Sequence, residues 1–289
     1  MHLYKTSEGP LVVNNEKAYL LQHDWDHLIN RRQLHHHLQQ LITKSTAISN
    51  SEYQQVVINP LAPIGSQEIW AAGVTYLRSR DARMEESKDS GGADFYQKVY
   101  EADRPELFFK ALPHRVAAHK EIVNIREDSS WNVPEPELTL FISSSGTIEA
   151  YTIGNDMSSR SIEGENPLYL PQAKVYERSA ALGPCLYIPG SPISPETTIS
   201  ITILRNGKQQ FHGTIQLSRM KRSLPELAEW LYKSCHFKTG CFLMTGTGLV
   251  PDDLFTLQEK DVVTIQIEGI GILENTVALL QDVSRKAAK

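Results

Sequence analysis

Three acidic residues near the middle of the chain have types and spacing that suit metal binding. Glu135 and Glu137 lie two residues apart, so on a β-strand both carboxylates would point to the same face. Residues 143–146 (Ser-Ser-Ser-Gly) are typical of a turn, and a hairpin centred near residue 145 would bring residue 135 opposite about residue 155, next to Asp156. Exposed acids at a strand end are the ordinary alternative. A converging cluster instead requires a cation, and an all-oxygen site favours Mg²⁺, Mn²⁺ or Ca²⁺.

The sequence after Asp156 resembles the fumarylacetoacetate hydrolase superfamily. The resemblance extends over about residues 66 to 281, and the similar segments occur in the same order as in that superfamily. These segments are residues 155–160 (Asn-Asp-Met-Ser-Ser-Arg), 166–174 (Asn-Pro-Leu-Tyr-Leu-Pro-Gln-Ala-Lys), 245–248 (Thr-Gly-Thr-Gly) and 267–275. The resemblance implies that Glu135, Glu137 and Asp156 bind Mg²⁺ or Mn²⁺ and that Lys174 lies beside the metal. It also implies that Thr247 contacts the substrate.

Residues 76–104 are dense in charge and are predicted to form a mobile lid. The segment contains Ser-Gly-Gly at residues 90–92, which we expect to act as a hinge. Arg78, Ser79 and Arg83 are candidates for contacts with the carboxylate or hydroxyls of a substrate, because guanidinium groups bind carboxylates through two hydrogen bonds. The alternative for each arginine is an ordinary salt bridge on a surface helix.

The same segment departs from the hydrolytic members of the superfamily. Many of those members carry a His and a Glu that activate water, whereas Ser79 and Ala82 stand at the two positions here. A glycine at residue 248 replaces the usual proline after Thr247. Together with residues 134–137 and 163–174, these features resemble the subgroup of 2-keto-3-deoxy sugar-acid (2-dehydro-3-deoxy-D-arabinonate) dehydratases.

Dehydration needs no activated water. It is therefore compatible with a site that keeps the acidic residues and Lys174 but lacks the His/Glu pair. A 2-keto acid can chelate a divalent ion, which stabilises the enolate formed when the C3 proton leaves, and loss of the C4 hydroxyl follows. Lys174 is the candidate base or enolate partner, and Glu106 is the candidate second acid or base, with a surface carboxylate as the alternative for Glu106. A 2-keto-3-deoxy pentonate would then give 2,5-dioxopentanoate.

Two other functions share these features. A metal-dependent acylpyruvate hydrolase or oxaloacetate decarboxylase would keep the metal site, but the missing His/Glu pair argues against it. A catalytically silent metal-binding protein would have lost Lys174 or a ligand, and neither is lost.

The elements that must position these residues are predicted to form an α+β fold that is mainly β. Apolar, β-branched runs separated by turn residues predict strands at residues 107–109, 138–142, 148–153, 199–204, 211–217, 262–267 and 276–280. Near-helical spacing predicts an amphipathic helical region at residues 20–42, and a capping box at residues 223–226 starts another helix. The resemblance implies a β-roll or distorted barrel-like core with a smaller N-terminal domain. A Pro-rich stretch places the boundary between domains 1–65 and 66–289.

Composition limits the classes of protein and partner. A chain of 289 residues with 40% apolar residues can form a sizeable core, and a net charge of -5 gives no electrostatic footprint for nucleic acid. We expect no membrane span and no signal peptide, and therefore a cytoplasmic protein. The three cysteines are predicted to be buried, reduced thiols. We expect a small 2-keto acid as the substrate and a homodimer or homotetramer as the assembly.

Overall fold

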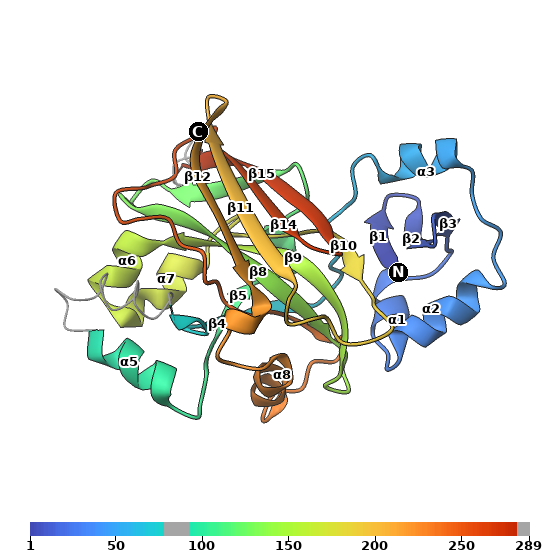
Figure 1. Cartoon of the computed structure of the whole chain (residues 1–289), viewed down its shortest axis with the longest axis horizontal. Coiled ribbons are helices and arrows are strands. Elements are labelled where there is room, and N and C mark those ends of the chain that lie inside the picture. The colour runs from blue at the N-terminus through green and yellow to red at the C-terminus, as the bar shows by residue number, and fades with distance from the viewer. Residues whose placement is uncertain (78–92, 282–289) are drawn as a thin grey trace, which may run out of the picture.

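The computed structural model describes residues 1–77 and 93–281, and its strands form two sheets (Figure 1). The larger sheet has ten strands. Its strand order is β3 (Lys17–Leu20), β2 (Gly9–Asn14), β1 (His2–Thr6), β10 (Ala180–Tyr187), β9 (Ile148–Ser159), β8 (Asn132–Ile142), β13 (Cys241–Met244), β4 (Glu68–Gly73) and β5 (Glu106–Ala111), and β6 (Val116–Ala117) pairs with β10. The smaller sheet has the order β12 (Lys208–Gln216), β11 (Thr198–Arg205), β14 (Val262–Ile267), β15 (Gly271–Leu280) and β7 (Ile122–Arg126).

The helices lie around these sheets (Figure 1). The N-terminal strands are accompanied by α1 (Trp25–Ile29), α2 (Leu34–Ile42) and α3 (Asn50–Val57), whereas the other end of the molecule carries α5 (Ala93–Glu101), α6 (Arg160–Glu165) and α7 (Leu170–Lys174). The helix α8 (Leu224–Tyr232) begins at the predicted capping box, in which Ser223 and Glu226 each accept a hydrogen bond from the backbone N–H of the other. Short 3-10 turns occur at η1 (Pro113–Arg115), η2 (Pro167–Tyr169) and η3 (Leu217–Arg219).

This architecture confirms the predicted α+β class with mainly β structure. The strands predicted from residue 107 onward correspond to β5, β8, β9, β11, β12, β14 and β15. Neither sheet closes into a barrel within the described ranges, because β3 and β5 remain the edges of one sheet and β12 and β7 the edges of the other. The core is therefore built from two open sheets.

The first 20 residues form strands that the sequence pattern did not predict. The strand β1 pairs with β10, with His2 opposite Tyr187, so β1 to β3 extend the larger sheet. The following helices bury their apolar positions, including Leu28 and Leu38, in one cluster with Phe141 and Ala150 of the larger sheet. The domain boundary at residue 65 stays a prediction.

The hairpin of β8 and β9 confirms the predicted register. Residue 135 lies opposite Asp156, and Gly154 lies opposite Glu137. The turn is closed by a hydrogen bond from Ser143 N to Thr147 O, and Gly146 adopts a φ of 78°, a left-handed conformation that favours glycine. Successive side chains along each strand then point to opposite faces of the hairpin.

One face of this hairpin packs against the smaller sheet. Leu138, Leu140 and Ile153 lie there in a cluster with Ile201 and Ile265. Because the acidic positions have the opposite parity along both strands, their side chains project from the other face. The apolar cluster therefore fixes the register that brings the carboxylates together.

Two further expectations can be compared with the described residues. None of the helices described is both long enough and apolar enough to cross a membrane. All three cysteines are free, but only Cys185 and Cys241 are buried. The prediction for Cys235 was wrong, because this residue lies on the exposed segment that follows α8.

Candidate active site

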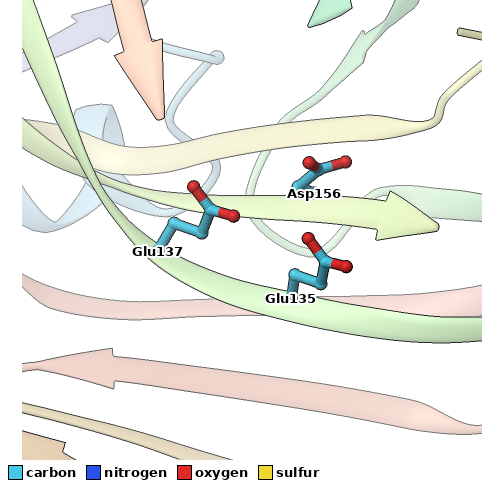
Figure 2. Close-up of side chains that lie close together, drawn as sticks. All are labelled: Glu135, Glu137 and Asp156. Atoms are coloured by element: carbon cyan, nitrogen blue, oxygen red, sulfur yellow. The ribbon is translucent and has the colours of Figure 1, made fainter. Parts of the chain in front are cut away.

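The three predicted ligands meet on one face of the β8–β9 hairpin. Figure 2 shows Glu135 and Glu137 projecting from β8 toward Asp156 of β9. One carboxylate oxygen of each residue lies within 4.8 Å of the other two, and the three residues are between 1% and 4% exposed. Three carboxylates can thus face one cation, and their oxygens are the ligands that Mg²⁺ and Ca²⁺ prefer.

Three buried cations surround two of these carboxylates. Lys174 Nζ donates to Glu135 Oε2 at 2.8 Å and to Asp156 Oδ2 at 3.2 Å. Arg160 Nη2 donates to Glu135 Oε1 at 2.8 Å, and Lys110 Nζ lies 2.6 Å from Asp156 Oδ1. Burial lowers the pKa of Lys110, and Asp156 opposes that shift. Each carboxylate oxygen has about two lone pairs, so these contacts leave acceptor sites for a metal.

Glu137 has a different environment. Gly246 N donates to Glu137 Oε2 at 2.6 Å, and no residue in the described ranges forms an ion pair with Glu137. Burial and then the neighbouring carboxylates of Asp156 and Glu135 raise the pKa of Glu137 well above its ordinary value. A buried carboxylate without a cation is the charge that a bound divalent ion would neutralise, so the site fits such an ion.

The raised pKa of Glu137 predicts pH-dependent metal binding. The carboxyl must lose its proton to bind a cation, so Mg²⁺ affinity should increase as pH rises from the ordinary carboxyl pKa of 4.5 until it passes the raised pKa, with proton release in that window. Calorimetric titrations in buffers of different ionisation enthalpy measure the release. Binding without proton release throughout this window would contradict the expectation.

The free energy of unfolding of the metal-free protein should fall as pH rises. The folded state keeps a proton on Glu137 that the unfolded state loses above a pKa of about 4.5. The stabilisation from Glu137 is therefore fully present below pH 4.5 and is lost as pH rises through the raised pKa of the folded state. Thermal unfolding in a chelator, compared with Glu137→Gln over the same pH range, isolates the contribution.

No side chain fits at Gly154 without crowding Thr139 and Met244. A Cβ atom at this residue would lie 2.3 Å from Thr139 Oγ1 and 3.1 Å from Met244 Cε. We expect Gly154→Ala to lower the free energy of unfolding by about 1–3 kcal/mol. It should also weaken Mg²⁺ binding, because residue 154 lies opposite Glu137 and two residues before Asp156. Thermal unfolding and Mg²⁺ titration measure the two effects.

Gly190→Ala is the matched control for this substitution. Its added Cβ would meet only the His35 ring, at an ordinary contact distance of 3.6 Å. The control should stay within about 0.5 kcal/mol of the parent protein. Equal effects of the two substitutions would contradict the crowding at Gly154.

Glu106 approaches the site from β5. It pairs with Gly73 of β4, and a Cβ at Gly73 would lie 2.0 Å from Glu106 Oε2, so a larger residue at this position would displace the carboxylate. The Oε2 atom is buried and has no hydrogen-bond partner in the described ranges. Gly73 also lines a small cavity of about 10 Å³ together with Phe108, Glu135, Arg160, Gly246 and Thr247. The predicted acid or base thus lies next to a residue that lines this cavity.

Of the four residues predicted to contact the substrate, the structure describes only Thr247. Thr247 is 4% exposed and lines the same cavity, where its hydroxyl accepts a hydrogen bond from Leu249 N. Arg78, Ser79 and Arg83 lie outside the described residues.

Sequence reasoning missed two of the buried cations. Lys110 directly follows the apolar strand at residues 107–109, and a lysine that continues such a strand is a signal for a buried charge. Arg160 begins the helix α6 four residues after Asp156, and its sequence context predicts only membership of a motif. Both contacts depend on how β5 and α6 pack against the hairpin, which local patterns do not determine.

Comparisons with known proteins agree with this geometry. The family model described as fumarylacetoacetate (FAA) hydrolase C-terminal matches residues 69–278. A probable 2-keto-3-deoxyxylonate dehydratase of Haloferax volcanii is 49% identical over 216 residues, which are 74% of this chain and 73% of the relative. A 2-dehydro-3-deoxy-D-arabinonate dehydratase of Saccharolobus solfataricus is 39% identical over 213 residues, covering 73% of this chain and 72% of the relative.

A solved structure is similar over nearly the whole chain. It is a 2-keto-3-deoxy-D-arabinonate dehydratase complexed with magnesium and 2,5-dioxopentanoate, with a TM-score of 0.82 and 30% sequence identity. The alignment covers 98% of this chain and 100% of that chain. The similarity therefore includes the N-terminal elements as well as the hairpin.

Proposed function

The chain belongs to the fumarylacetoacetate hydrolase family, and from this premise we propose that it is a hydro-lyase acting on a 2-keto-3-deoxy sugar acid. A pentonate is the proposed substrate, and 2,5-dioxopentanoate is the proposed product. The observation that carries the proposal is the buried group of Glu135, Glu137, Asp156 and Lys174 in a chain whose named relatives are dehydratases of this substrate class.

We propose that Glu135, Glu137 and Asp156 hold Mg²⁺, with Mn²⁺ and Ca²⁺ as substitutes to be tested. The magnesium-bound neighbour and the all-oxygen donor set support this choice. The ion would supply Lewis-acid chemistry, drawing electron density from the 2-keto group and making the C3 protons more acidic.

The chain itself would move the protons. Lys174 donates to Glu135 and Asp156, and a divalent ion on those carboxylates would disfavour its ammonium form, so that the amine would accept a C3 proton. Glu106 would donate a proton to the C4 hydroxyl as it leaves as water, since its Oε2 atom is buried without a hydrogen-bond partner in the described ranges and lies next to Gly73, which lines the cavity. Glu106 would then take a proton from C5 while Lys174 returns its proton to C3, which gives the C4–C5 enol. Tautomerisation of this enol, in which the hydroxyl proton is lost and C4 is protonated, gives the aldehyde at C5, and the net change is loss of one water.

We propose that the substrate is oriented by Thr247, Arg78, Ser79 and Arg83. The buried position of Thr247 at the cavity supports its part in this set. The three lid residues are proposed from sequence alone, because guanidinium and hydroxyl groups suit a polyhydroxy acid.

An acylpyruvate hydrolase or oxaloacetate decarboxylase is the second candidate. Either enzyme would use the same metal site, but the hydrolase needs an activated water, and the pair that activates water in the hydrolytic members is absent at Ser79 and Ala82. The test is a panel of substrates offered to the purified protein with Mg²⁺: 2-keto-3-deoxy pentonates and hexonates, acylpyruvates and oxaloacetate. We expect the highest kcat/KM for a deoxy keto acid. A higher kcat/KM for an acylpyruvate would assign the hydrolase function instead.

We also propose a symmetric homodimer or homotetramer. Closed symmetric assemblies are the common solution for soluble enzymes of this size. Sedimentation at micromolar concentration should show a species of at least twice the chain mass of 32.5 kDa. A monomer as the sole species would contradict this expectation. A cytoplasmic location also stays a prediction.

A further inference from the structure

Lys110 is a second lysine at the site, and its surroundings differ from those of Lys174. Its side chain is fully buried. The pairing of β4 with β5 shifts at this residue, because Ile69 lies opposite Ala111 while Trp70 lies opposite Phe109, which leaves Lys110 unpaired in a bulge. A β-bulge re-aims a side chain and is common beside active sites.

The ammonium group of Lys110 has three oxygens around it. Nζ lies 2.6 Å from Asp156 Oδ1, donates to Met157 O at 2.9 Å, and donates to the carbonyl oxygen of Lys174. Two of the three ammonium protons are donated to backbone carbonyls, and the contact with Asp156 is an ion pair whose geometry is not that of a hydrogen bond. Its contacts are all with groups of the protein.

These contacts connect the two parts of the site. The Asp156 carboxylate is held between two lysines, with Oδ1 beside Lys110 and Oδ2 beside Lys174. The carbonyl of Lys174 ends α7, and Ser179 Oγ also donates to it at 3.0 Å. One ammonium thus ties the strand that carries Asp156 to the helix that carries Lys174.

We propose that Lys110 is a positioning residue for both Asp156 and Lys174. It sets the orientation of the Asp156 carboxylate toward the metal. Through the carbonyl oxygen of Lys174 it also fixes the backbone from which the Lys174 side chain extends. The effect on turnover rests on the proposed function, whereas the effect on metal binding does not require a substrate. The two can therefore be measured separately.

The test is Lys110→Met, which keeps the length of the side chain and removes the ammonium. Outer-shell partners of metal ligands contribute about 10- to 100-fold to metal affinity or activity, so we expect the Kd for Mg²⁺ to rise and kcat to fall by such factors, with a smaller change in KM. Titration calorimetry without substrate gives the Kd. The Mn²⁺ electron paramagnetic resonance spectrum should also change, because the carboxylate would reorient.

Lys5→Met is the matched control. Lys5 is a partly buried lysine that also donates to a main-chain carbonyl, that of Ile64, but it lies in the N-terminal part of the chain. The control should keep the Mg²⁺ affinity, the Mn²⁺ spectrum and kcat of the parent protein. A spectrum changed in Lys110→Met alone separates positioning from a general loss of packing.

A folded Lys110→Met protein with unchanged Kd, spectrum and kcat would overturn the proposal. Tighter Mg²⁺ binding with an unchanged spectrum would also overturn it, because Lys110 would then be only a counter-charge. If Lys110→Met does not fold, Lys110→Arg replaces it; a planar guanidinium does not reproduce the three contacts, so an unaltered enzyme would overturn the proposal. If the parent protein binds Mg²⁺ but turns over no deoxy keto acid, the proposed function fails while the metal data still decide the role of Lys110.

Discussion

Glu137→Gln should lose Mg²⁺ affinity and turnover together, each by at least about 100-fold. The amide keeps the shape of the side chain but removes the charge. Glu135 and Asp156 already contact Lys174, Lys110 or Arg160, whereas Glu137 accepts only from a backbone N–H within the described ranges. Glu137 is thus the carboxylate whose charge a metal must neutralise. Titration calorimetry and initial rates at saturating substrate measure the two losses.

Glu149→Gln is the matched control for this substitution. Glu149 lies on the same strand as Asp156 but at the turn end, where it accepts hydrogen bonds from Leu34 N and Thr147 Oγ1. The control should keep the parent Kd for Mg²⁺ and the parent kcat. Full activity of Glu137→Gln in a chelator would contradict the metal assignment.

Lys174→Met should lose turnover while it still binds Mg²⁺. General acid or base groups contribute about 10²- to 10⁴-fold, and the loss should be in kcat rather than KM, because the proposed role of the amine is at the reacting carbon. Its contacts with Glu135 and Asp156 show that it is a neighbour of the proposed ligands and not one of them. Steady-state kinetics and calorimetry on the same preparation give both results.

Lys5→Met again serves as the control, since it removes a lysine amine remote from the site. It should keep the parent kcat. A Lys174→Met protein that binds no Mg²⁺, or one that turns over at the parent rate, would contradict the assignment of this lysine as the base.

The acidic site could be predicted because it depends on local patterns. A two-residue spacing and a four-residue turn determine which carboxylates share a face, and the structure confirms the pairing of Glu135 with Asp156. The resemblance then added Lys174, which lies on a helix that the spacing of the hairpin does not position. Glu106 was proposed from its place before a strand, and the glycine opposite it at residue 73 leaves room for its carboxylate.

The N-terminal strands could not be predicted in the same way. The turn between β2 and β3 has Asn15 and Glu16 at φ values of 48° and 62°. That geometry normally favours Asn-Gly, and a glutamate at the second position removes the usual signal. The strands are also only four to six residues long. The sequence pattern of the N-terminal region therefore predicts the helices that follow these strands, but not the strands themselves.

Lys110 shows the other limit of sequence patterns. Its contacts join residues separated by 47 and 64 positions, and they require a bulge that shifts the pairing of β5 by one residue. Neither the bulge nor the packing of α7 has a signature in the apolar run that precedes Lys110. Long-range packing placed this cation, and only the folded structure shows it.

The most direct test of the account is to identify the product by NMR. Purified protein is incubated with Mg²⁺ and a 2-keto-3-deoxy pentonate, and carbon and proton spectra are followed with time, with a chelator-treated sample beside it. We expect 2,5-dioxopentanoate to appear at the rate at which the substrate disappears, and only with the metal present. Formation of pyruvate and glycolaldehyde by carbon–carbon cleavage, or an unchanged pentonate beside a rapidly cleaved acylpyruvate, would contradict the dehydratase function.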